Sequence, residues 1–372
     1  MKITLISMLS VVQTPPKSYG GSELLHWQMA KMFSQFDNEV TLIALKGSQT
    51  PPKGSLIEIE PLGSYSELNF GREIDRLIGN KAALDAIKSA DIVWDCSDYK
   101  QGAQYIFDKT NHKRALPYYT NGVYFAYPEL HYNCVGESKT HAQMAIQNAS
   151  GYEGFKFPDA AEMTRGLLMD ECEYLYPPVD ESDFIYREEF KESYFLTLGR
   201  FSEDKGQELV LDIASRLPNE KFVIAGSTEF EGHKAYFEGF IKPLAEKLSN
   251  VQLILNPTQE QKRQLLTDAK GTIMPSGLKT GFLESFGVVA VESLLSGTPV
   301  IITPLGTLPE IVTNKKSGFV FMNDFQLMNA VFNIQKVKRS DCRNEGKRFN
   351  YSECYSRASY LMSKVQKGEY WK

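Results

Sequence analysis

Short runs of β-branched and aromatic residues alternate with longer amphipathic segments along the whole chain. The two longer segments of the first half, Ser22–Phe36 and Arg72–Lys88, have the hydrophobic spacing of helices. Strands that alternate with helices are typical of βαβ units and parallel sheets. The expected strands are Ile3–Ser7, Val40–Leu45, Ile92–Trp94, Leu116–Tyr119, Tyr194–Leu198, Phe222–Ala225, Val251–Leu255, Thr272–Met274, Val300–Ile302 and Phe319–Phe321.

This pattern occurs in two series and therefore predicts two doubly wound α/β domains. The chain of 372 residues is also too long for one ordinary hydrophobic core. The best boundary is Tyr176–Asp183, because its paired prolines resist both helix and central strand. We expect a Rossmann-like domain over residues 1–180 and a second one over residues 181–350. A last helix, Tyr351–Gln366, is expected after the final strand.

Composition narrows the class of protein without changing this picture. The net charge of −5 does not favour binding of nucleic acid, which usually goes with an excess of basic residues. The five cysteines are odd in number and lack C-x-x-C spacing, which favours reduced thiols over a zinc site or a disulfide framework. The longest apolar stretch, Phe286–Ile302, is interrupted by polar residues, glycine and proline and cannot span a membrane. We expect a cytoplasmic protein, for which peripheral contact with a membrane stays open.

The first candidate binding loop lies between the first expected strand and helix and contains Gly20 and Gly21. Two glycines allow close approach of the backbone to a ligand, and Ser22 is placed to cap the following helix. The free N–H groups at such a helix start favour a phosphate. The loop is neither G-x-G-x-x-G nor a P-loop, and the alternative is an ordinary flexible connection.

The second candidate loop directly follows the first strand of the second series. It carries Gly199, Arg200 and Lys205. An arginine fork and a lysine point charge that leave one strand together can converge on a dianion such as a diphosphate. The alternative is a solvated turn, in which Glu203 and Asp204 offset the two cations.

The third candidate, the segment from Pro275 to Glu292, is the most specific. A helix is expected to begin near Ser285, with Glu284 just outside it and Glu292 roughly 12 Å further along the axis. One carboxylate can then reach a sugar and the other a ribose, while backbone N–H groups face phosphates. Glu292 interrupts an apolar helix and needs a partner if it is buried. The backbone donors in question belong to Phe286, Gly287 and Val288.

Taken together, these motifs resemble the retaining glycosyltransferases of family four, which have the GT-B fold. The resemblance covers the second half almost throughout, and its hallmark is Glu284 and Glu292 with seven residues between them. The Gly199–Gly206 loop and the turn Gly306–Glu310 follow in the expected order, although that turn alone reads as a mere connection. The first half matches more weakly, through the opening strand, the Gly20–Gly21 loop and the segment Val135–His141.

The resemblance implies two Rossmann-like domains that face each other across a cleft, with residues 351–372 crossing back to the first domain. It implies transfer of a sugar, with retention, from a UDP- or GDP-sugar to a glycan, glycolipid or small acceptor, as in polysaccharide or glycolipid biosynthesis. No cofactor or metal is implied. Arg200 and Lys205 would stabilise the departing diphosphate, Glu284 would bind sugar hydroxyls and Glu292 the ribose. Gly20, Gly21, Gly199 and the N–H groups of Phe286, Gly287 and Val288 would also contact the donor.

One position departs from the family pattern. Many members carry a histidine close to the transferred sugar, after a strand in the middle of the first domain, where this chain has Asn121. An amide can still bond a sugar hydroxyl, so Asn121 is kept as a candidate catalytic residue. The alternative readings are a non-catalytic sugar-nucleotide-binding subunit and a GT-B sugar-nucleotide epimerase. A phosphorylase-like enzyme would need a lysine motif for pyridoxal phosphate, and none is evident.

Overall fold

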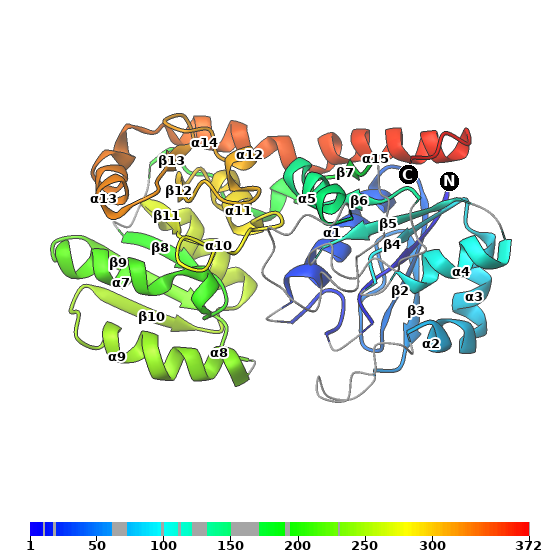
Figure 1. Cartoon of the computed structure of the whole chain (residues 1–372), viewed down its shortest axis with the longest axis horizontal. Coiled ribbons are helices and arrows are strands. Elements are labelled where there is room, and N and C mark those ends of the chain that lie inside the picture. The colour runs from blue at the N-terminus through cyan, green and yellow to red at the C-terminus, as the bar shows by residue number, and fades with distance from the viewer. Residues whose placement is uncertain are drawn as a thin grey trace. The chain divides into compact units, whose positions relative to one another are not determined.

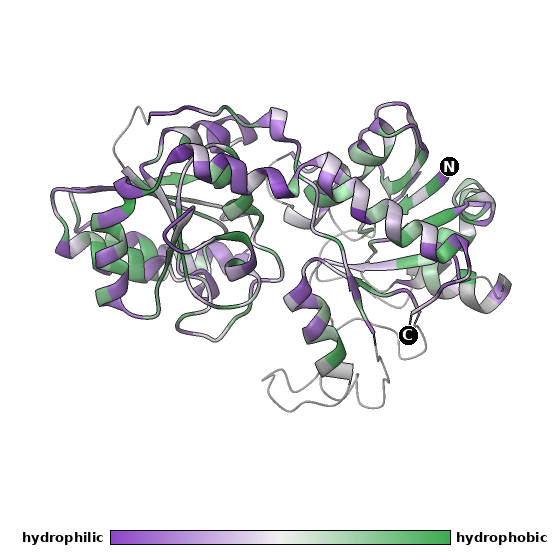
Figure 2. Cartoon of the chain, turned by 90° about the horizontal axis from the view of Figure 1, so that it is seen from above, coloured by the Kyte–Doolittle hydropathy of each residue, from purple (hydrophilic) through white to green (hydrophobic). Residues whose placement is uncertain are grey.

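A computed structural model describes residues 1–9, 12–17, 20–61, 73–97, 100–110, 113–120, 132–149, 171–189, 194–229 and 231–371. The chain forms two compact units (Figure 1). The first unit consists of Met1–Pro178 and Tyr351–Lys372, and the second of Val179–Asn350. In both units the strands are largely hydrophobic, whereas the helices carry hydrophilic and hydrophobic residues in turn (Figure 2).

The first unit contains a parallel sheet with the strand order β3-β2-β1-β4-β5-β6-β7. Four of its strands lie where the sequence predicts them, to within a residue or two. The edge strand β3 and the two-residue strands β6 and β7 were not predicted. The bounds are β1 Lys2–Ile6, β2 Glu39–Leu45, β3 Gly54–Ile59, β4 Ile92–Asp95, β5 Ala115–Tyr119, β6 Val135–Gly136 and β7 Glu173–Tyr174.

The helices of the first unit correct one expectation. The predicted helix Arg72–Lys88 is two helices, because Asn80 caps the second one by accepting a hydrogen bond from Ala83 N–H at 3.1 Å. A short amide side chain that bonds the backbone in this way favours a helix start over a helix interior. The bounds are α1 Gly21–Gln35, α2 Glu73–Gly79, α3 Lys81–Ser89, α4 Gln101–Thr110, α5 Lys139–Ala149 and α15 Tyr351–Gln366.

The last helix, α15, packs into the core of the first unit. The ring of Tyr355 stacks on Phe36 with the centroids 4.1 Å apart, and its hydroxyl accepts a hydrogen bond from Asn38 at 3.1 Å. Beyond the helix, the indole N–H of Trp371 donates to the carbonyl of Cys134 at 2.8 Å. Leu361 and Met362 are fully buried in the same cluster as the strands and α1.

The second unit contains a parallel sheet with the order β10-β9-β8-β11-β12-β13. The strands are β8 Tyr194–Leu198, β9 Lys221–Gly226, β10 Val251–Leu255, β11 Gly271–Met274, β12 Val300–Ile302 and β13 Gly318–Val320. The helices are α7 Gln207–Arg216, α8 Glu231–Tyr236, α9 Lys242–Ala245, α10 Gln259–Asp268, α11 Val288–Leu295, α12 Leu308–Ile311, α13 Asp324–Asn333 and α14 Arg339–Gly346. The expectation of two doubly wound α/β units is confirmed.

The strand order of the second unit reverses between β8 and β11, which are direct neighbours. In open parallel sheets, ligands bind outside the carboxyl ends of the strands at such a switch point. The loops that follow β8 and β11 carry the candidate residues of the sequence motifs, so the topology brings these motifs to one place.

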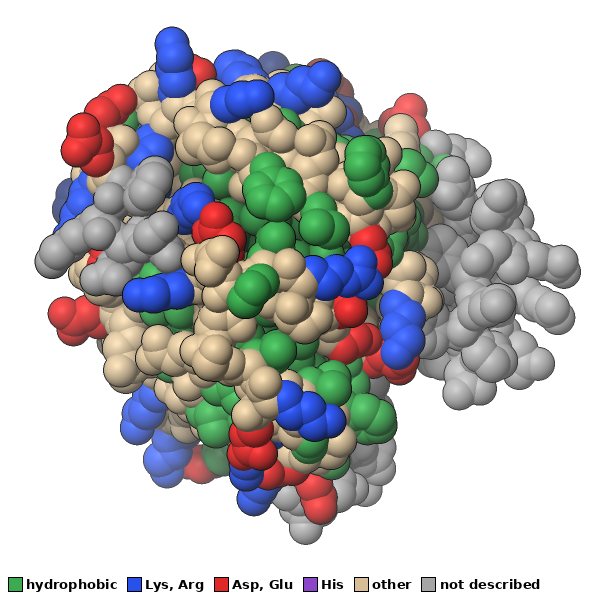
Figure 3. Space-filling view, turned by 90° about the vertical axis from the view of Figure 1, so that its left-hand side faces the viewer, with side chains coloured by type: hydrophobic (Ala, Val, Ile, Leu, Met, Phe, Trp, Pro, Cys, Tyr) green, Lys and Arg blue, Asp and Glu red, His purple; other side chains and the backbone are tan. Residues whose placement is uncertain are grey.

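The surface of the second unit exposes several large hydrophobic side chains. Phe325 on α13 is 80% exposed, and Met322, Phe332 and Phe240 are also exposed. Basic and acidic side chains are interspersed with hydrophobic ones on the face shown in Figure 3. None of the helices in the described part of the chain has the length and apolar character needed to cross a membrane.

Candidate donor-binding site

The loop after β8 holds Arg200 against its own acidic neighbour. The guanidinium donates to Asp204 Oδ2 at 2.5 Å and to the Ser202 hydroxyl at 3.3 Å. Burial raises the pKa of the Asp204 carboxyl, but Arg200, the Ser202 hydroxyl and Lys205 together bring it below its ordinary value. Asp204 is therefore ionised at neutral pH, and the charged pair fixes the direction of the arginine.

Lys205 connects this loop to the loop after β11. Its ammonium donates to Glu284 Oε1, and the two side chains are largely buried, with 19% and 10% exposed. Both cations also lie over the ring of Phe282, with Lys205 Nζ 5.1 Å and the Arg200 guanidinium 5.8 Å from its centroid. The structure thus brings together Arg200, Lys205 and Glu284, which the sequence analysis selected separately.

The backbone of these two loops depends on a glycine. Gly206 ends the turn that contains Lys205 and has a left-handed conformation, with φ of 65°. A Cβ atom at this position would lie 2.9 Å from the carbonyl oxygen of Pro275, at the end of β11. Gly277 N–H also donates to Asp204 O at 2.8 Å. Close contact between the two loops therefore requires glycine at position 206.

The helix after β11 begins later than the sequence predicted. Helix α11 begins at Val288, and its N-cap is Gly287, with φ of 88°, instead of Ser285. Glycine is favoured here because the conformation is left-handed and a Cβ would lie 2.7 Å from Leu308 Cδ2. Glu284 therefore belongs to irregular backbone before the helix, and the expected spacing of the two glutamates along one helix axis is wrong.

The turn after β12 holds Glu284 in place. Thr307 N–H donates to the Glu284 carbonyl at 3.0 Å, and the Thr307 hydroxyl donates to the Ser285 carbonyl at 2.6 Å. A Cβ on Gly306 would lie 2.4 Å from the Glu284 carbonyl oxygen. The segment Gly306–Glu310 is therefore a support for Glu284 and more than a connection.

The three expected backbone donors differ in their surroundings. Gly287 and Val288 lie at the amino end of α11, where N–H groups lack partners within the helix. Phe286 has a buried side chain that packs edge-on against Phe349, with the ring centroids 5.5 Å apart. The phenyl ring of Phe286 is thus part of the core. Gly199 directly follows β8, and its N–H donates to Ala225 O at 3.1 Å.

Glu292 is buried in the second turn of α11 and has a cationic partner. Lys262 of α10 donates to Glu292 Oε1 at 2.6 Å, and the two side chains are 15% and 4% exposed. The other carboxylate oxygen, Oε2, is buried and accepts no hydrogen bond within the part of the chain that the structure describes. The sequence indicated that Glu292 needs a partner, but it did not identify Lys262, which lies 30 positions earlier.

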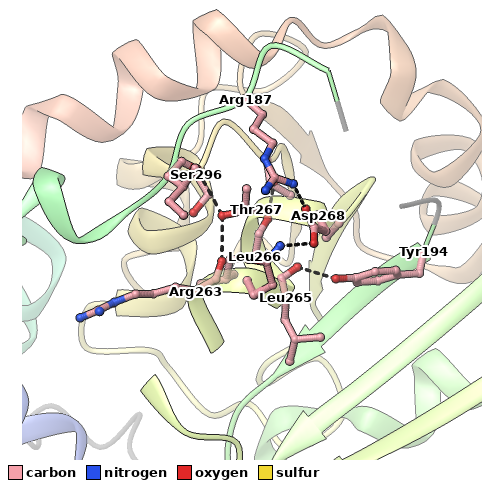
Figure 4. Close-up of polar contacts among 12 residues, drawn as sticks. Arg187, Tyr194, Arg263, Leu265, Leu266, Thr267, Asp268 and Ser296 are labelled. Carbon is pink, nitrogen blue, oxygen red and sulfur yellow. Dashed lines mark hydrogen bonds and ion pairs between the residues drawn. The ribbon is translucent and has the colours of Figure 1, made fainter. Parts of the chain in front are cut away.

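Helix α10 is fixed at both ends, which places Lys262. At its start, Thr258 and Gln261 form a capping box, with bonds of 3.2 Å and 2.9 Å between side chain and backbone. At its end, Asp268 accepts hydrogen bonds from Arg187 and Gln264, and the Tyr194 hydroxyl donates to Leu265 O at 2.9 Å (Figure 4). A box of the type T-x-x-Q is readable from sequence and would have located this helix start.

In the first unit, Gly20 is the N-cap of α1, with φ of 145°, so the expectation that Ser22 caps this helix is wrong. A Cβ on Gly20 would lie 2.7 Å from Pro16 Cβ, whereas Gly21 has open space around its Cα. Asn121, the proposed replacement for the family's histidine, lies outside the described residues.

A buried polar cluster in the first unit was not predicted. His26 Nδ1 lies 3.0 Å from the Ser7 hydroxyl after β1, and His141 Nδ1 accepts from Glu137 N–H at 3.2 Å after β6. Burial, and then the charge of the buried Lys100 after β4, lower the pKa of His26 to about 3 and of His141 to about 4. Both imidazoles are therefore neutral. The sequence gives little indication of this cluster. His26 lies within an expected helix like its neighbours, and His141 was noted only as part of the segment that resembles the family.

Comparison with known proteins finds a family that the second unit resembles. Residues 179–351 match the family described as Glycosyl transferases group 1. The second unit is thus similar to this family over its whole length. D-inositol 3-phosphate glycosyltransferase of Mycobacterium leprae is 32% identical to the chain over 124 residues, which are 32% of the chain and 27% of that protein. The chain thus matches about a quarter of the length of this curated relative.

The likeness to solved structures extends over both units. AviGT4, a glycosyltransferase involved in avilamycin A biosynthesis, has a TM-score of 0.71 at 20% identity, and the match covers 100% of both chains. Anabaena Alr3699/HepE, solved in complex with UDP and glucose, has a TM-score of 0.67 at 15% identity, with 98% of this chain and 99% of that chain covered. The second unit is thus one half of a GT-B fold.

Proposed function

We propose that the chain is a retaining glycosyltransferase that moves a sugar from a nucleoside-diphosphate sugar to a hydroxyl of a glycan, a glycolipid or a small acceptor. The observation that carries this proposal is the convergence of Arg200, Lys205 and Glu284 at the switch point of the unit that resembles Glycosyl transferases group 1. A UDP- or GDP-sugar is the proposed donor, and the UDP complex of Alr3699/HepE supports the uridine nucleotide.

The chemical task of the site is to stabilise charge on the departing diphosphate. Arg200 and Lys205 are held by Asp204 and Glu284, so they are oriented before the donor arrives. An ammonium has three N–H donors, which allows Lys205 to keep Glu284 and bind a phosphate oxygen at the same time. A diphosphate carries more negative charge than Asp204 and competes with it for the arginine. Preorganised donors of this kind typically contribute about 10²–10³ in rate each.

We propose that the transfer proceeds with retention and without a protein nucleophile, as the resemblance to family four implies. As the bond between C1 of the sugar and the diphosphate oxygen breaks, the acceptor oxygen attacks the same face of the sugar. The acceptor's proton passes to the departing diphosphate. In this proposal Glu284 binds hydroxyls of the transferred sugar and Glu292 binds the ribose. The cations and the amino end of α11 supply the positive charge that a metal ion would otherwise provide.

Nucleotide binding tests the donor site. We expect that one of UDP, GDP and ADP, added without metal, raises the melting temperature by several degrees, because saturation at about 100 times Kd adds roughly 2.7 kcal/mol. Arg200→Ala should abolish that shift. Arg216→Ala is the matched control, since Arg216 forms ion pairs with Asp212 and Asp324 on the surface of the same unit. A flat response of the unaltered protein to every nucleotide would contradict the proposal.

A further inference from the structure

The loop after β11 folds back on itself and is tied to the loop after β8. Within it, Gly281 N–H donates to the Gly277 carbonyl at 2.7 Å, and both glycines have a left-handed backbone. Lys279 Nζ lies 2.8 Å from Glu203 Oε1 in the loop after β8. These contacts leave the side chain of Phe282 beside the two cations of the candidate site.

The ring of Phe282 lies within cation–π distance of both cations. Lys205 Nζ is 5.1 Å and the guanidinium carbon of Arg200 is 5.8 Å from the ring centroid. A cation within about 6 Å of a ring face is attracted by the ring quadrupole, and the attraction is stronger where water is excluded. The Lys205 and Arg200 side chains are 19% and 32% exposed. One ring therefore contacts both groups that are proposed to bind the diphosphate.

The other partners of the two cations are carboxylates. Arg200 is bound by Asp204, and Lys205 is bound by Glu284. A carboxylate repels a diphosphate, so each of these ion pairs partly opposes binding of the donor. The ring of Phe282 carries no net charge, and the field of a quadrupole is weak beyond the cation that the ring contacts. The ring can therefore hold the cations without repelling an anion on their other side.

The ring matters more once a diphosphate is bound. In the free protein, Asp204 holds the Arg200 guanidinium whether or not the ring contributes. A bound diphosphate competes with Asp204, and this ion pair weakens as the guanidinium turns toward the phosphate. The ring of Phe282 then remains as a neutral partner. A contact changes affinity only by the amount by which it is stronger in the bound state, and this contact meets that condition.

We propose that Phe282 is a positioning residue of the diphosphate site: its ring holds Arg200 and Lys205 by cation–π contact and keeps them directed at the phosphates of a bound nucleoside diphosphate. This inference rests on the proposed function and adds an aromatic residue to its donor site. Phe282 acts on the nucleotide through the two cations. The property that decides its effect is therefore the electron density of the ring face, and its size alone is not enough.

The test changes the charge of the ring face at nearly constant shape. UDP, GDP and ADP are titrated by isothermal titration calorimetry into the unaltered protein and into a variant with pentafluorophenylalanine at position 282, whose ring face is positive in place of negative. For the diphosphate that binds, this variant should bind at least about 10-fold more weakly. Phe282→Leu, which only removes the ring, should bind about 5-fold more weakly. Phe282→Tyr keeps the ring face and should stay within about 2-fold.

The matched control has pentafluorophenylalanine at position 240. Phe240 lies in the same unit, is 62% exposed, and stacks on Tyr236 with the ring centroids 5.3 Å apart. Its substitution should leave the affinity within about 2-fold of that of the unaltered protein. Melting curves without ligand show whether each variant is folded. If the fluorinated variant at position 282 does not fold, Phe282→Leu and Phe282→Tyr decide, since of the two only tyrosine keeps the ring.

Each outcome assigns the failure. Equal affinity of the unaltered protein and the folded variants at position 282 overturns the role of Phe282 while the nucleotide site stands. Weaker binding by Phe282→Leu together with unchanged binding by the fluorinated variant would show that the ring acts by packing, which overturns the role as well. If no nucleoside diphosphate binds the unaltered protein, the proposed function fails together with this inference.

Discussion

At the scale of single residues, His26 and His141 are fully buried near Lys100 at the carboxyl ends of the first unit's strands. Their pKa values of about 3 and about 4 in the folded protein lie below the ordinary 6.5 of the unfolded chain. Between pH 6.5 and about 4 the unfolded chain therefore binds protons that the folded protein does not. Their contribution to stability is fully present above pH 6.5 and is lost as the pH falls.

We therefore predict that the free energy of unfolding falls with pH by about 1.4 kcal/mol per pH unit for each of these histidines below pH 6.5. Urea unfolding at pH 7 and pH 5 measures this slope in the unaltered protein and in His26→Gln/His141→Gln. Carboxylates contribute equally to both proteins, so the difference between the two slopes isolates the histidines. Identical slopes would show that these side chains do not control the acid sensitivity.

Some residues of the candidate site could be predicted from the sequence, and others could not. Arg200, Lys205 and Glu284 were selectable because each sits in a loop at the end of an apolar strand. A partner for buried Glu292 was predictable as a requirement, because a lone buried charge is costly. The identity of that partner was not predictable, because Lys262 reaches Glu292 only through the packing of α10 beside α11.

At the scale of elements, α14 holds the carboxyl ends of α10 and α11. The buried guanidinium of Arg339 donates to Thr267 O at 2.8 Å, to Ala269 O at 3.1 Å and to Ser296 O at 3.0 Å. These carbonyls have no partner within their own helices, and a cation at a helix carboxyl end also offsets the helix dipole. The helices that carry Lys262 and Glu292 are thus tied together by one side chain.

Arg339→Met should lower the free energy of unfolding by about 3–5 kcal/mol, because it leaves several buried carbonyl groups without a donor. Urea denaturation measures the loss. Arg216→Met is the control and should cost less than about 1 kcal/mol, since Arg216 makes surface ion pairs at 44% exposure. A loss below about 1 kcal/mol in the Arg339 variant would mean that its hydrogen bonds do not hold the two helices.

Elements differ in how well their bounds could be predicted. Strands β8, β10 and β12 have the predicted bounds. For β8 and β12 the reason is that buried parallel strands read as largely apolar runs, whereas the edge strand β10 keeps the alternation of a half-exposed strand around Gln252. The start of α11 was misplaced because Ser285 is a good cap by residue type, whereas the choice of Gly287 depends on the distant Leu308. Strands β6 and β7 have two residues each and leave no periodic signal.

At the scale of the whole molecule, the chain consists of two parallel-sheet units in a GT-B fold. The sequence predicted this architecture because the alternation of strands and helices occurs twice, with paired prolines between the two series. The family match covers the second unit alone. The donor half of the proposed reaction is therefore the part to test first.

The most direct measurement is the release of nucleoside diphosphate from a panel of UDP- and GDP-sugars by the purified chain in the presence of EDTA. We predict that one donor is consumed, at a rate that the chelator does not change, and that Arg200→Ala lowers this rate by about 10²–10³. Consumption would also exclude a non-catalytic binding subunit. No release from any donor would contradict the proposed transferase activity, and release that EDTA abolishes and magnesium restores would contradict its independence of metal.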